Sequence, residues 1–153
     1  MQQRYIGALD IWEPRIVWIE GGYHPAMHDT TIFRGAKNAE TEDEDCDPNA
    51  LAYTLDFERG QRFVADDALS SVRGKVVTSR EEHSPEYREF IARIKNRQET
   101  LFKRMKDFDV LEERFGYGAT SLQRREMHKL CVDACAVIVQ YDFENGHPPF
   151  DVC

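Results

Sequence analysis

The sequence predicts an α/β domain in which short strands come first and long helices follow. Two β-prone apolar runs, residues 4–11 and 15–20, flank the turn Trp12-Glu13-Pro14. Helical periodicity then dominates residues 84–108 and 120–144. Strands followed by helices, with at least one antiparallel pair, indicate an α/β arrangement. A length of 153 residues suggests one domain, 1–153.

The first segment, residues 1–34, is predicted to hold a β-hairpin and a short helix. The runs "RYIGALDI" and "RIVWIE" are close enough in sequence to pair as antiparallel strands. Gly21, Gly22 and Pro25 then break the second strand, and Asp29 or Thr30 is a suitable N-cap for a helix. That helix is expected to run through Ile32 and Phe33.

Residues 35–50 are predicted to form an acidic, mobile linker. Within them, residues 38–47 hold six acids and no base. The net charge of −8 argues against a broad basic surface for nucleic acid. The next segment, residues 51–80, holds a third strand at Arg62–Ala65 and a possible short strand at Lys75–Val77.

Two long helices are predicted within residues 84–145, followed by an extended tail, 146–153, that contains two prolines. Ser84 and Pro85 suit the start of the first helix, which runs to about Phe108. The second runs from Thr120-Ser121 to just before Asn145. The expected apolar stripe of the first is Tyr87, Ile91, Ile94, Leu101 and Met105 with Phe90 or Phe102, and the expected buried face of the second is Leu122, Leu130, Ala134, Val137, Ile138 and Tyr141.

The four cysteines, at positions 46, 131, 135 and 153, are interpreted as free thiols. The chain opens with no apolar leader, and its longest apolar runs are too short to cross a bilayer. We therefore expect a reducing intracellular location, nuclear or cytoplasmic, and no membrane partner.

Asp66 and Glu99 are the candidate metal ligands and catalytic residues. Asp66 lies where the third strand should end, and Glu99 lies on the first long helix. Acids from a strand end and a helix can converge on Mg²⁺, which takes one or two carboxylates together with waters and substrate phosphates. The alternative interpretation is that Asp66 and Glu99 are ordinary solvated acids, one at a strand end and one on a helix surface, and bind no metal.

Four segments resemble, in order, the carboxyl-terminal part of the catalytic domain of PIF/Harbinger-type DDE transposase nucleases, within the DDE superfamily endonucleases. "GGYHPAMHDTTIFRG" resembles a loop that leads through an Asp into a short helix. "RFVADDALSSVRGK" resembles the strand that ends at the second acid, and "NRQETLFKRMKDFDVL" the R-x-E helix with the third. The close, "AVIVQYDFENGHPPFDV", resembles the tail of the group.

The resemblance implies an RNase H-like mixed sheet with flanking helices. It matches Asp66 to the second acid and Glu99 to the third. It also implies Mg²⁺ or Mn²⁺ as the cofactor, and phosphodiester cleavage or strand transfer on DNA in the nucleus. A separate DNA-binding partner protein is a further implication.

The sequence departs from the family pattern at three places. The strand that bears the family's first acid lies upstream of the hairpin, so we expect a domain truncated at its N-terminal strand. Asp10 is a poor substitute for that acid, and Ala68 and Leu69 stand where Gly and Tyr are usual. We therefore expect impaired cleavage, and self-association through an open hairpin edge.

Two other functional classes stay open. One is a non-catalytic, domesticated remnant that binds protein or DNA through a basic helix, and the other is a structural α/β module whose acids are only solvated. The basic helix face could contact phosphates, or could form salt bridges with interspersed glutamates. Its members are Arg88, Arg93, Lys95, Arg97, Lys103, Arg104 and Lys106.

Two histidine-containing sets are weaker candidates. His128, Cys131 and Cys135 share one helix face and could offer zinc three ligands, although small core residues are the more common role of such cysteines. His24 and His28 flank Pro25, and His28 with Asp29 could orient a substrate. A surface histidine beside a helix cap explains the second set as well.

Overall fold

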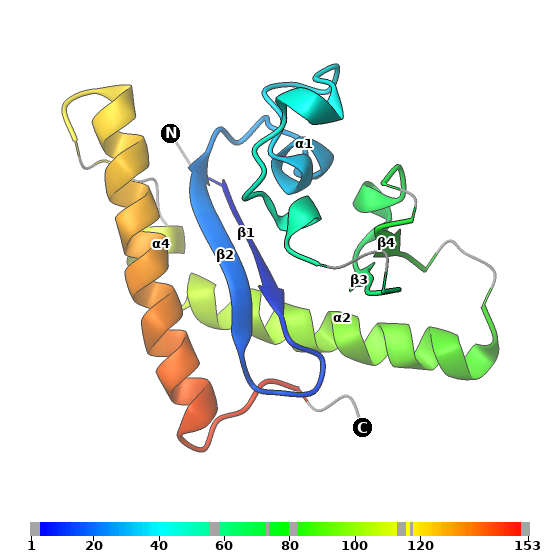
Figure 1. The fold of residues 1–153 in the computed structure, drawn as a ribbon. Helices are drawn as coiled ribbons and strands as arrows, with labels where there is room; N and C mark the ends of the chain where they lie inside the picture. The colour runs from blue at the N-terminus through cyan, green and yellow to red at the C-terminus, as the bar shows by residue number, and fades with distance from the viewer. Residues whose placement is uncertain are drawn as a thin grey trace. The chain divides into compact units, whose positions relative to one another are not determined.

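The chain is a mixed α/β protein, and the part of it described by its computed structural model holds two small sheets and four α-helices (Figure 1). The structure describes residues 4–55, 59–72, 74–79, 83–112, 116 and 118–150. Contacts divide the chain into two compact units. Unit 1 is Met1–Pro25 with Asn96–Cys153, and unit 2 is Ala26–Lys95. Arg73 and the end of the predicted tail, residues 151–153 with Cys153, lie outside the described residues.

The hairpin of unit 1 confirms the predicted antiparallel pair, but the prediction that Gly21 and Gly22 break the second strand is wrong, because both lie within that strand. Strand β1 (Arg4–Leu9) pairs antiparallel with β2 (Ile16–Tyr23), and Gly7 lies opposite Ile19 in the register. Asp10 closes the turn, because its Oδ1 accepts the backbone N–H groups of Trp12 and Glu13 at 2.8 and 3.0 Å. These hydrogen bonds lower the pKa of Asp10, with the bond from Glu13 the largest cause. Asp10 therefore has a structural role in the turn.

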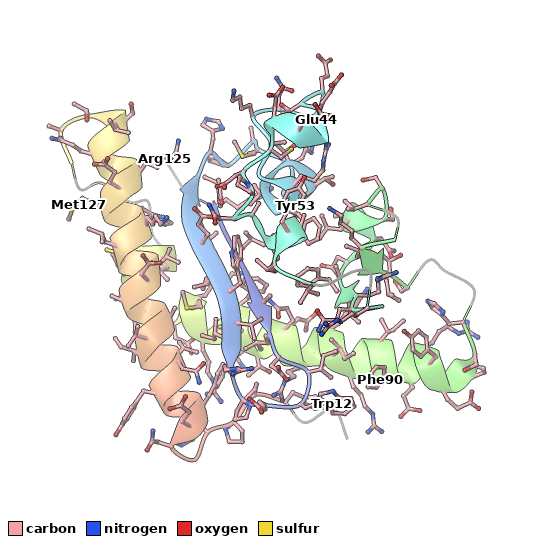
Figure 2. The ribbon with its side chains drawn as sticks, viewed as in Figure 1. Trp12, Glu44, Tyr53, Phe90, Arg125 and Met127 are labelled. Carbon is pink, nitrogen blue, oxygen red and sulfur yellow. The ribbon has the colours of Figure 1, made fainter. Side chains whose placement is uncertain are left out.

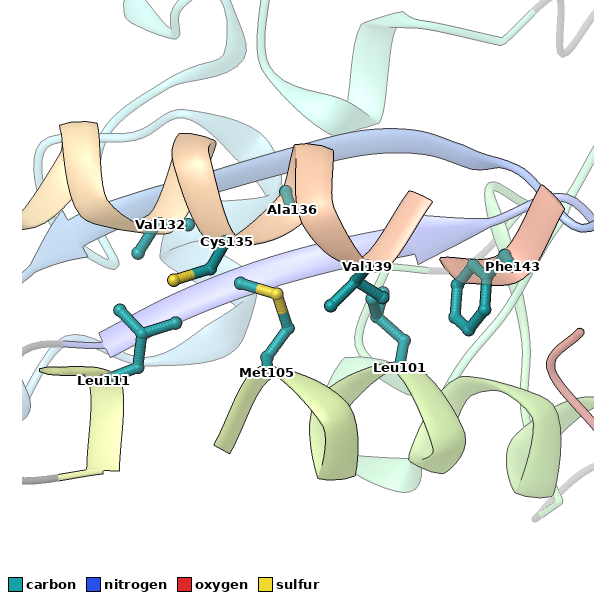
Figure 3. Packing of buried hydrophobic residues seen from close by; sticks show 8 residues of the cluster. All are labelled: Leu101, Met105, Leu111, Val132, Cys135, Ala136, Val139 and Phe143. Atoms are coloured by element: carbon teal, nitrogen blue, oxygen red, sulfur yellow. The ribbon is translucent and has the colours of Figure 1, made fainter. Parts of the chain in front are cut away.

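Helix α4 (Ser121–Glu144) lies along β2 and supplies most of the core of unit 1 (Figures 1 and 3). Thr120 begins it with a capping box, in which the side chains of Thr120 and Gln123 each accept a backbone N–H. Both ends of this predicted helix are confirmed. The core cluster consists of Leu101, Met105, Leu111, Val132, Cys135, Ala136, Val139 and Phe143.

The predicted buried face of α4 is wrong. Leu130, Val137 and Tyr141 are 61%, 70% and 68% exposed, and Leu122, Ala134 and Ile138 are exposed as well. The helix instead buries His128, Val132, Cys135, Ala136, Val139 and Phe143. Apolar residues occur on two opposite faces of this helix, so periodicity alone does not identify the face that packs on the sheet.

Helix α2 (Pro85–Lys106) confirms the first long helix, and its residues from Asn96 onward belong to unit 1. The Oγ of Ser84 accepts the backbone N–H of Tyr87, as expected of an N-cap. Ile91, Ile94, Leu101 and Met105 are buried, whereas Tyr87 is 39% exposed. A single turn, α3 (Asp109–Glu112), follows and adds Leu111 to the core.

Unit 2 joins a short helix to a two-stranded parallel sheet. Helix α1 (Asp29–Arg34) is present where the sequence predicts it, and β3 (Phe63–Val64) pairs with β4 (Val76–Val77). The 3₁₀ turns are η1 (Asp43–Asp45), η2 (Leu51–Tyr53) and η3 (Asp67–Leu69).

The acidic segment 35–50 folds back on α1. Gly35 ends α1 with φ of 67°, a left-handed conformation that glycine adopts without strain. Asp47 donates its N–H to the carbonyl of Gly35, and Cys46 and Ala50 are buried. A Cβ at Gly35 would lie 2.6 Å from the Cβ of Ala50, so the loop approaches the end of α1 closely.

Within the described part of the chain, no helix is both long and apolar enough to span a membrane.

Candidate functional site

Asp66 lies directly after the end of β3, where the sequence predicts it. Ala65 still pairs with Val77 through its N–H, and Asp66 then takes an extended conformation as the N-cap of η3. Its side chain makes no capping bond and is 82% exposed. The carboxylate is therefore available to a cation or to a positively charged side chain.

A short polar network occupies the surface around Asp66 in unit 2. The Nζ of Lys95 lies 3.4 Å from Oδ1 of Asp66 and donates to the Oγ of Ser79 at 3.2 Å. Ser79 in turn donates to Oδ1 of Asp67 at 2.9 Å. One lysine thus balances part of the charge of two adjacent acids, and any metal at Asp66 would compete with that ammonium group.

Glu99 is an exposed residue of α2 and belongs to unit 1, one helical turn after Lys95. Its carboxylate makes no hydrogen bond or ion pair with any residue that the structure describes. Asp66 and Glu99 therefore have different local environments. The first is ion-paired and the second is solvated.

Asp66 and Glu99 offer carboxylate oxygens, which suit Mg²⁺ only where other ligands complete its coordination. In the residues that the structure covers, no three or more His, Cys, Asp or Glu side chains form a group that could hold a metal ion. Mg²⁺ can bind through one or two carboxylates if waters and substrate phosphates complete its six oxygens.

Arg97, the arginine of the R-x-E segment, is a buried structural residue. It is 5% exposed, and its Nε and Nη1 donate to the carbonyls of Asp10 and Phe150, each at 2.9 Å. Its Nη2 donates to the carbonyl of Glu13. Three backbone acceptors hold this guanidinium inside unit 1, so it does not contribute to a phosphate-binding surface.

Two glutamines, which the sequence patterns do not single out, bind the outer edges of the hairpin. Gln98 donates to the carbonyl of Gly7 at 2.7 Å and accepts the N–H of Leu9 at 3.3 Å. Gln140 accepts the N–H of Ile16 at 2.7 Å and donates to the carbonyl of Pro14 at 3.0 Å. These hydrogen bonds cover part of each edge that would otherwise favour strand addition.

The predicted basic face of α2 divides into two groups. Four members are buried or paired: Arg97 is buried, Arg104 pairs with Asp142 at 2.6 Å, Arg93 with Glu89 at 2.8 Å, and Lys95 with Asp66 at 3.4 Å. Arg88, Lys103 and Lys106 are exposed. Much of the basic character of this helix therefore serves folding, and three exposed cations are what it offers to an anionic partner.

The set of His128, Cys131 and Cys135 belongs to the core. His128 and Cys135 are buried, and Cys131 packs against the core cluster, which confirms the structural interpretation of the two cysteines. Burial lowers the pKa of His128 and raises that of Cys135, so both groups favour their neutral forms. In the other histidine set, the carbonyl of His28 accepts the N–H of Ile32 at the start of α1.

Comparisons with protein-family models, with curated proteins and with solved structures give no significant match. The resemblance to DDE nucleases therefore depends on the sequence motifs.

Proposed function

We propose that the chain is a transposase-derived nuclease domain of the DDE class, with an RNase H-like fold and impaired phosphodiester cleavage of DNA. The observation that carries this proposal is the exposed carboxylate of Asp66, which follows a strand end in the motif that resembles the second acid. Its partner Lys95 is on α2, the same helix that carries Glu99, the residue matched to the third acid.

Asp66 and Glu99 would supply hard oxygen ligands to Mg²⁺ or Mn²⁺ in this proposal. A bound divalent ion would stabilise the negative charge that develops on the attacking and leaving oxygens of a phosphodiester. Lys95 would be displaced from Asp66 and would then be free to contact a substrate phosphate.

A DNA-nicking assay tests this function. Supercoiled plasmid is incubated with the protein and Mn²⁺, and we expect weak nicking that falls about tenfold or more in Asp66→Ala and Glu99→Ala. Glu89→Ala is the matched control, because Glu89 is another exposed acid on α2 and pairs with Arg93 on the surface. Nicking that is equal in all four proteins would show that the activity does not come from these acids.

A non-catalytic role as a DNA- or protein-binding remnant is the second candidate, and the ion pair between Asp66 and Lys95 favours it. In that case Asp66 serves the surface network of unit 2 rather than a metal. The exposed cations Arg88, Lys103 and Lys106 would then contact DNA phosphates.

Fluorescence anisotropy with a labelled duplex separates the two candidates. A DNA-binding remnant should bind duplex without Mn²⁺, and Lys103→Ala with Lys106→Ala should reduce the salt dependence of log K by about one unit for each phosphate that the variant no longer binds. The nuclease proposal instead predicts that Mn²⁺ and both acids are needed for cleavage. Duplex binding with the same affinity and salt dependence in the lysine variant as in the native chain would exclude this DNA-binding role.

A further inference from the structure

Helix α4 has a second apolar face on the side opposite the core. Met127, Leu130, Ala134, Val137 and Tyr141 are spaced 3, 4, 3 and 4 residues apart and define what we call the outer face. This is the a/d spacing of two heptads, and it places all five side chains in one stripe about 21 Å long.

The outer face is exposed along its whole length. All five of its residues are exposed, and so is its apolar neighbour Ile138. Figure 2 shows Met127 on the side of α4 that faces away from β2. A continuous apolar stripe without a charged side chain is typical of a binding surface, because soluble proteins rarely leave one in water.

The spacing specifies the shape of what binds this face. Positions that alternate by three and four residues present knobs and holes to a second helix, rather than to a strand or a flat surface. Ala134 at the centre allows the backbones to approach closely, with larger side chains at the two ends of the stripe. The occupant that fits is an amphipathic helix of about two heptads.

Negative charge along one edge of the outer face indicates which side chains the partner helix should carry on the flank that meets it. Glu126 and Asp133 each precede an apolar position of the stripe, so both lie along the same edge. Neither acid makes an ion pair with any other residue that the structure describes. The opposite edge carries the uncharged residues Cys131 and Ile138. A partner with basic residues on one flank would therefore complement this surface.

A second copy of the chain fits this charge pattern poorly. In a parallel pair of α4 helices, the edge of Glu126 and Asp133 would meet the uncharged edge of Cys131 and Ile138. In an antiparallel pair, like edges meet and the acids would face acids. An anionic membrane surface would be repelled by the same edge.

We propose that the outer face of α4 binds an amphipathic helix of another protein, whose apolar a/d residues pack on Leu130, Ala134 and Val137 and whose Lys or Arg residues pair with Glu126 and Asp133. This interaction does not depend on the proposed nuclease function, and it uses none of the proposed metal ligands.

Two synthetic helical peptides of three heptads test the proposal. Both have Leu at the a and d positions, and one carries Lys along its flanks while the other carries Glu. With each peptide fluorescently labelled, anisotropy titrations at low salt should show saturable binding of the Lys peptide to the whole chain and at least about tenfold weaker binding of the Glu peptide. Raising the salt concentration should reduce that difference.

Substitutions on the outer face locate the binding. Val137→Asp and Leu130→Asp should each weaken binding of the Lys peptide about tenfold or more. The uncharged Val137→Gln should weaken this binding less. Val17→Asp is the control, because Val17 is an exposed apolar residue of β2 outside the outer face. Circular dichroism should show unchanged helix content in every variant, since all four substitutions are at exposed positions.

Reversal of the acidic edge gives the sharpest result. The double variant Glu126→Lys with Asp133→Lys should prefer the Glu peptide to the Lys peptide. The proposal is overturned if the Lys peptide shows no saturable binding, or if both peptides bind equally to the native chain. It is also overturned if sedimentation shows a homodimer that Val137→Asp dissociates, because the second copy would then be the occupant.

Discussion

The guanidinium of Arg97 on α2 donates to the backbone carbonyls of Asp10 and Glu13 and so fixes the turn between β1 and β2. A third hydrogen bond, to the carbonyl of Phe150, ties the end of the described chain to the same side chain. Hydrogen bonds from a charged donor to buried carbonyls are among the stronger ones in proteins. This residue therefore links three separate segments of unit 1.

Arg97→Ala should destabilise the chain by about 2–4 kcal/mol, because it removes a buried, packed side chain and its three hydrogen bonds to backbone carbonyls. Arg97→Lys should recover only part of this, since an ammonium cannot reproduce the planar guanidinium fork. Urea unfolding measures both. Arg93→Ala is the matched control on the same helix, and the loss of its exposed pair with Glu89 should cost less than about 1 kcal/mol. An equal cost for the two alanine variants would contradict the structural role of Arg97.

Tyr5→Phe should leave the stability unchanged or raise it by about 1 kcal/mol. The Oη of Tyr5 is buried and has no hydrogen-bond partner in the described structure, so its removal relieves a desolvated polar group. Thermal unfolding of the variant and the native chain gives the comparison. A loss of more than about 1 kcal/mol would mean that the hydroxyl is bonded in solution.

The same tyrosine should make stability fall at alkaline pH. Burial, with a smaller effect of Cys135, raises the pKa of Tyr5 to about 12 from an ordinary value of 10.0. Ionisation of Tyr5 therefore leaves the free energy of unfolding unchanged below pH 10.0. As the pH rises towards 12, the unfolded chain loses this proton more readily than the folded one, so the free energy of unfolding falls. Urea unfolding at pH 9 and pH 11 should show a smaller loss of stability in Tyr5→Phe than in the native chain. An equal loss in both proteins would exclude Tyr5 as a source.

Gly21→Ala should destabilise the packing of α4 on β2 by about 1–3 kcal/mol. A Cβ at Gly21 would lie 2.8 Å from Cγ2 of Val132, closer than side chains tolerate. Val132→Ala creates a cavity that can accept this Cβ, so the double variant should cost less than the sum of the two single variants by at least about 0.5 kcal/mol. Additive costs in a urea-unfolding cycle would show that the two residues do not touch.

The ends of most elements follow from local chemistry. Helix starts are marked by the caps Ser84 and Thr120, and the hairpin turn by the fixed backbone of Pro14. Each of these effects depends on a few neighbouring residues. The face of α4 that packs inward is not local, because Val132 and Val137 are equally apolar and only the position of β2 distinguishes them. Charge alone predicts the acidic segment as a linker, while Ala36, Cys46 and Ala50 supply the apolar contacts that fold it.

The candidate site shows the same division. Asp66 at a strand end is predictable, because the strand run and the acid are adjacent in sequence. The burial of Arg97 is not, since its acceptors are the carbonyls of residues distant in sequence. Whether Asp66 and Glu99 share an ion depends on the arrangement of two units, which no local pattern encodes.

Mn²⁺ binding measured by electron paramagnetic resonance tests the central proposal most directly. The native chain should show saturable binding of Mn²⁺, strengthened by a DNA duplex, that Asp66→Ala and Glu99→Ala each abolish, while Glu89→Ala leaves it intact. Asp66 is 82% exposed and its pair with Lys95 is a surface one, so Asp66→Ala should not unfold the chain. Binding that persists in either acid variant, or no saturable binding by the native chain with duplex present, would contradict a shared metal site.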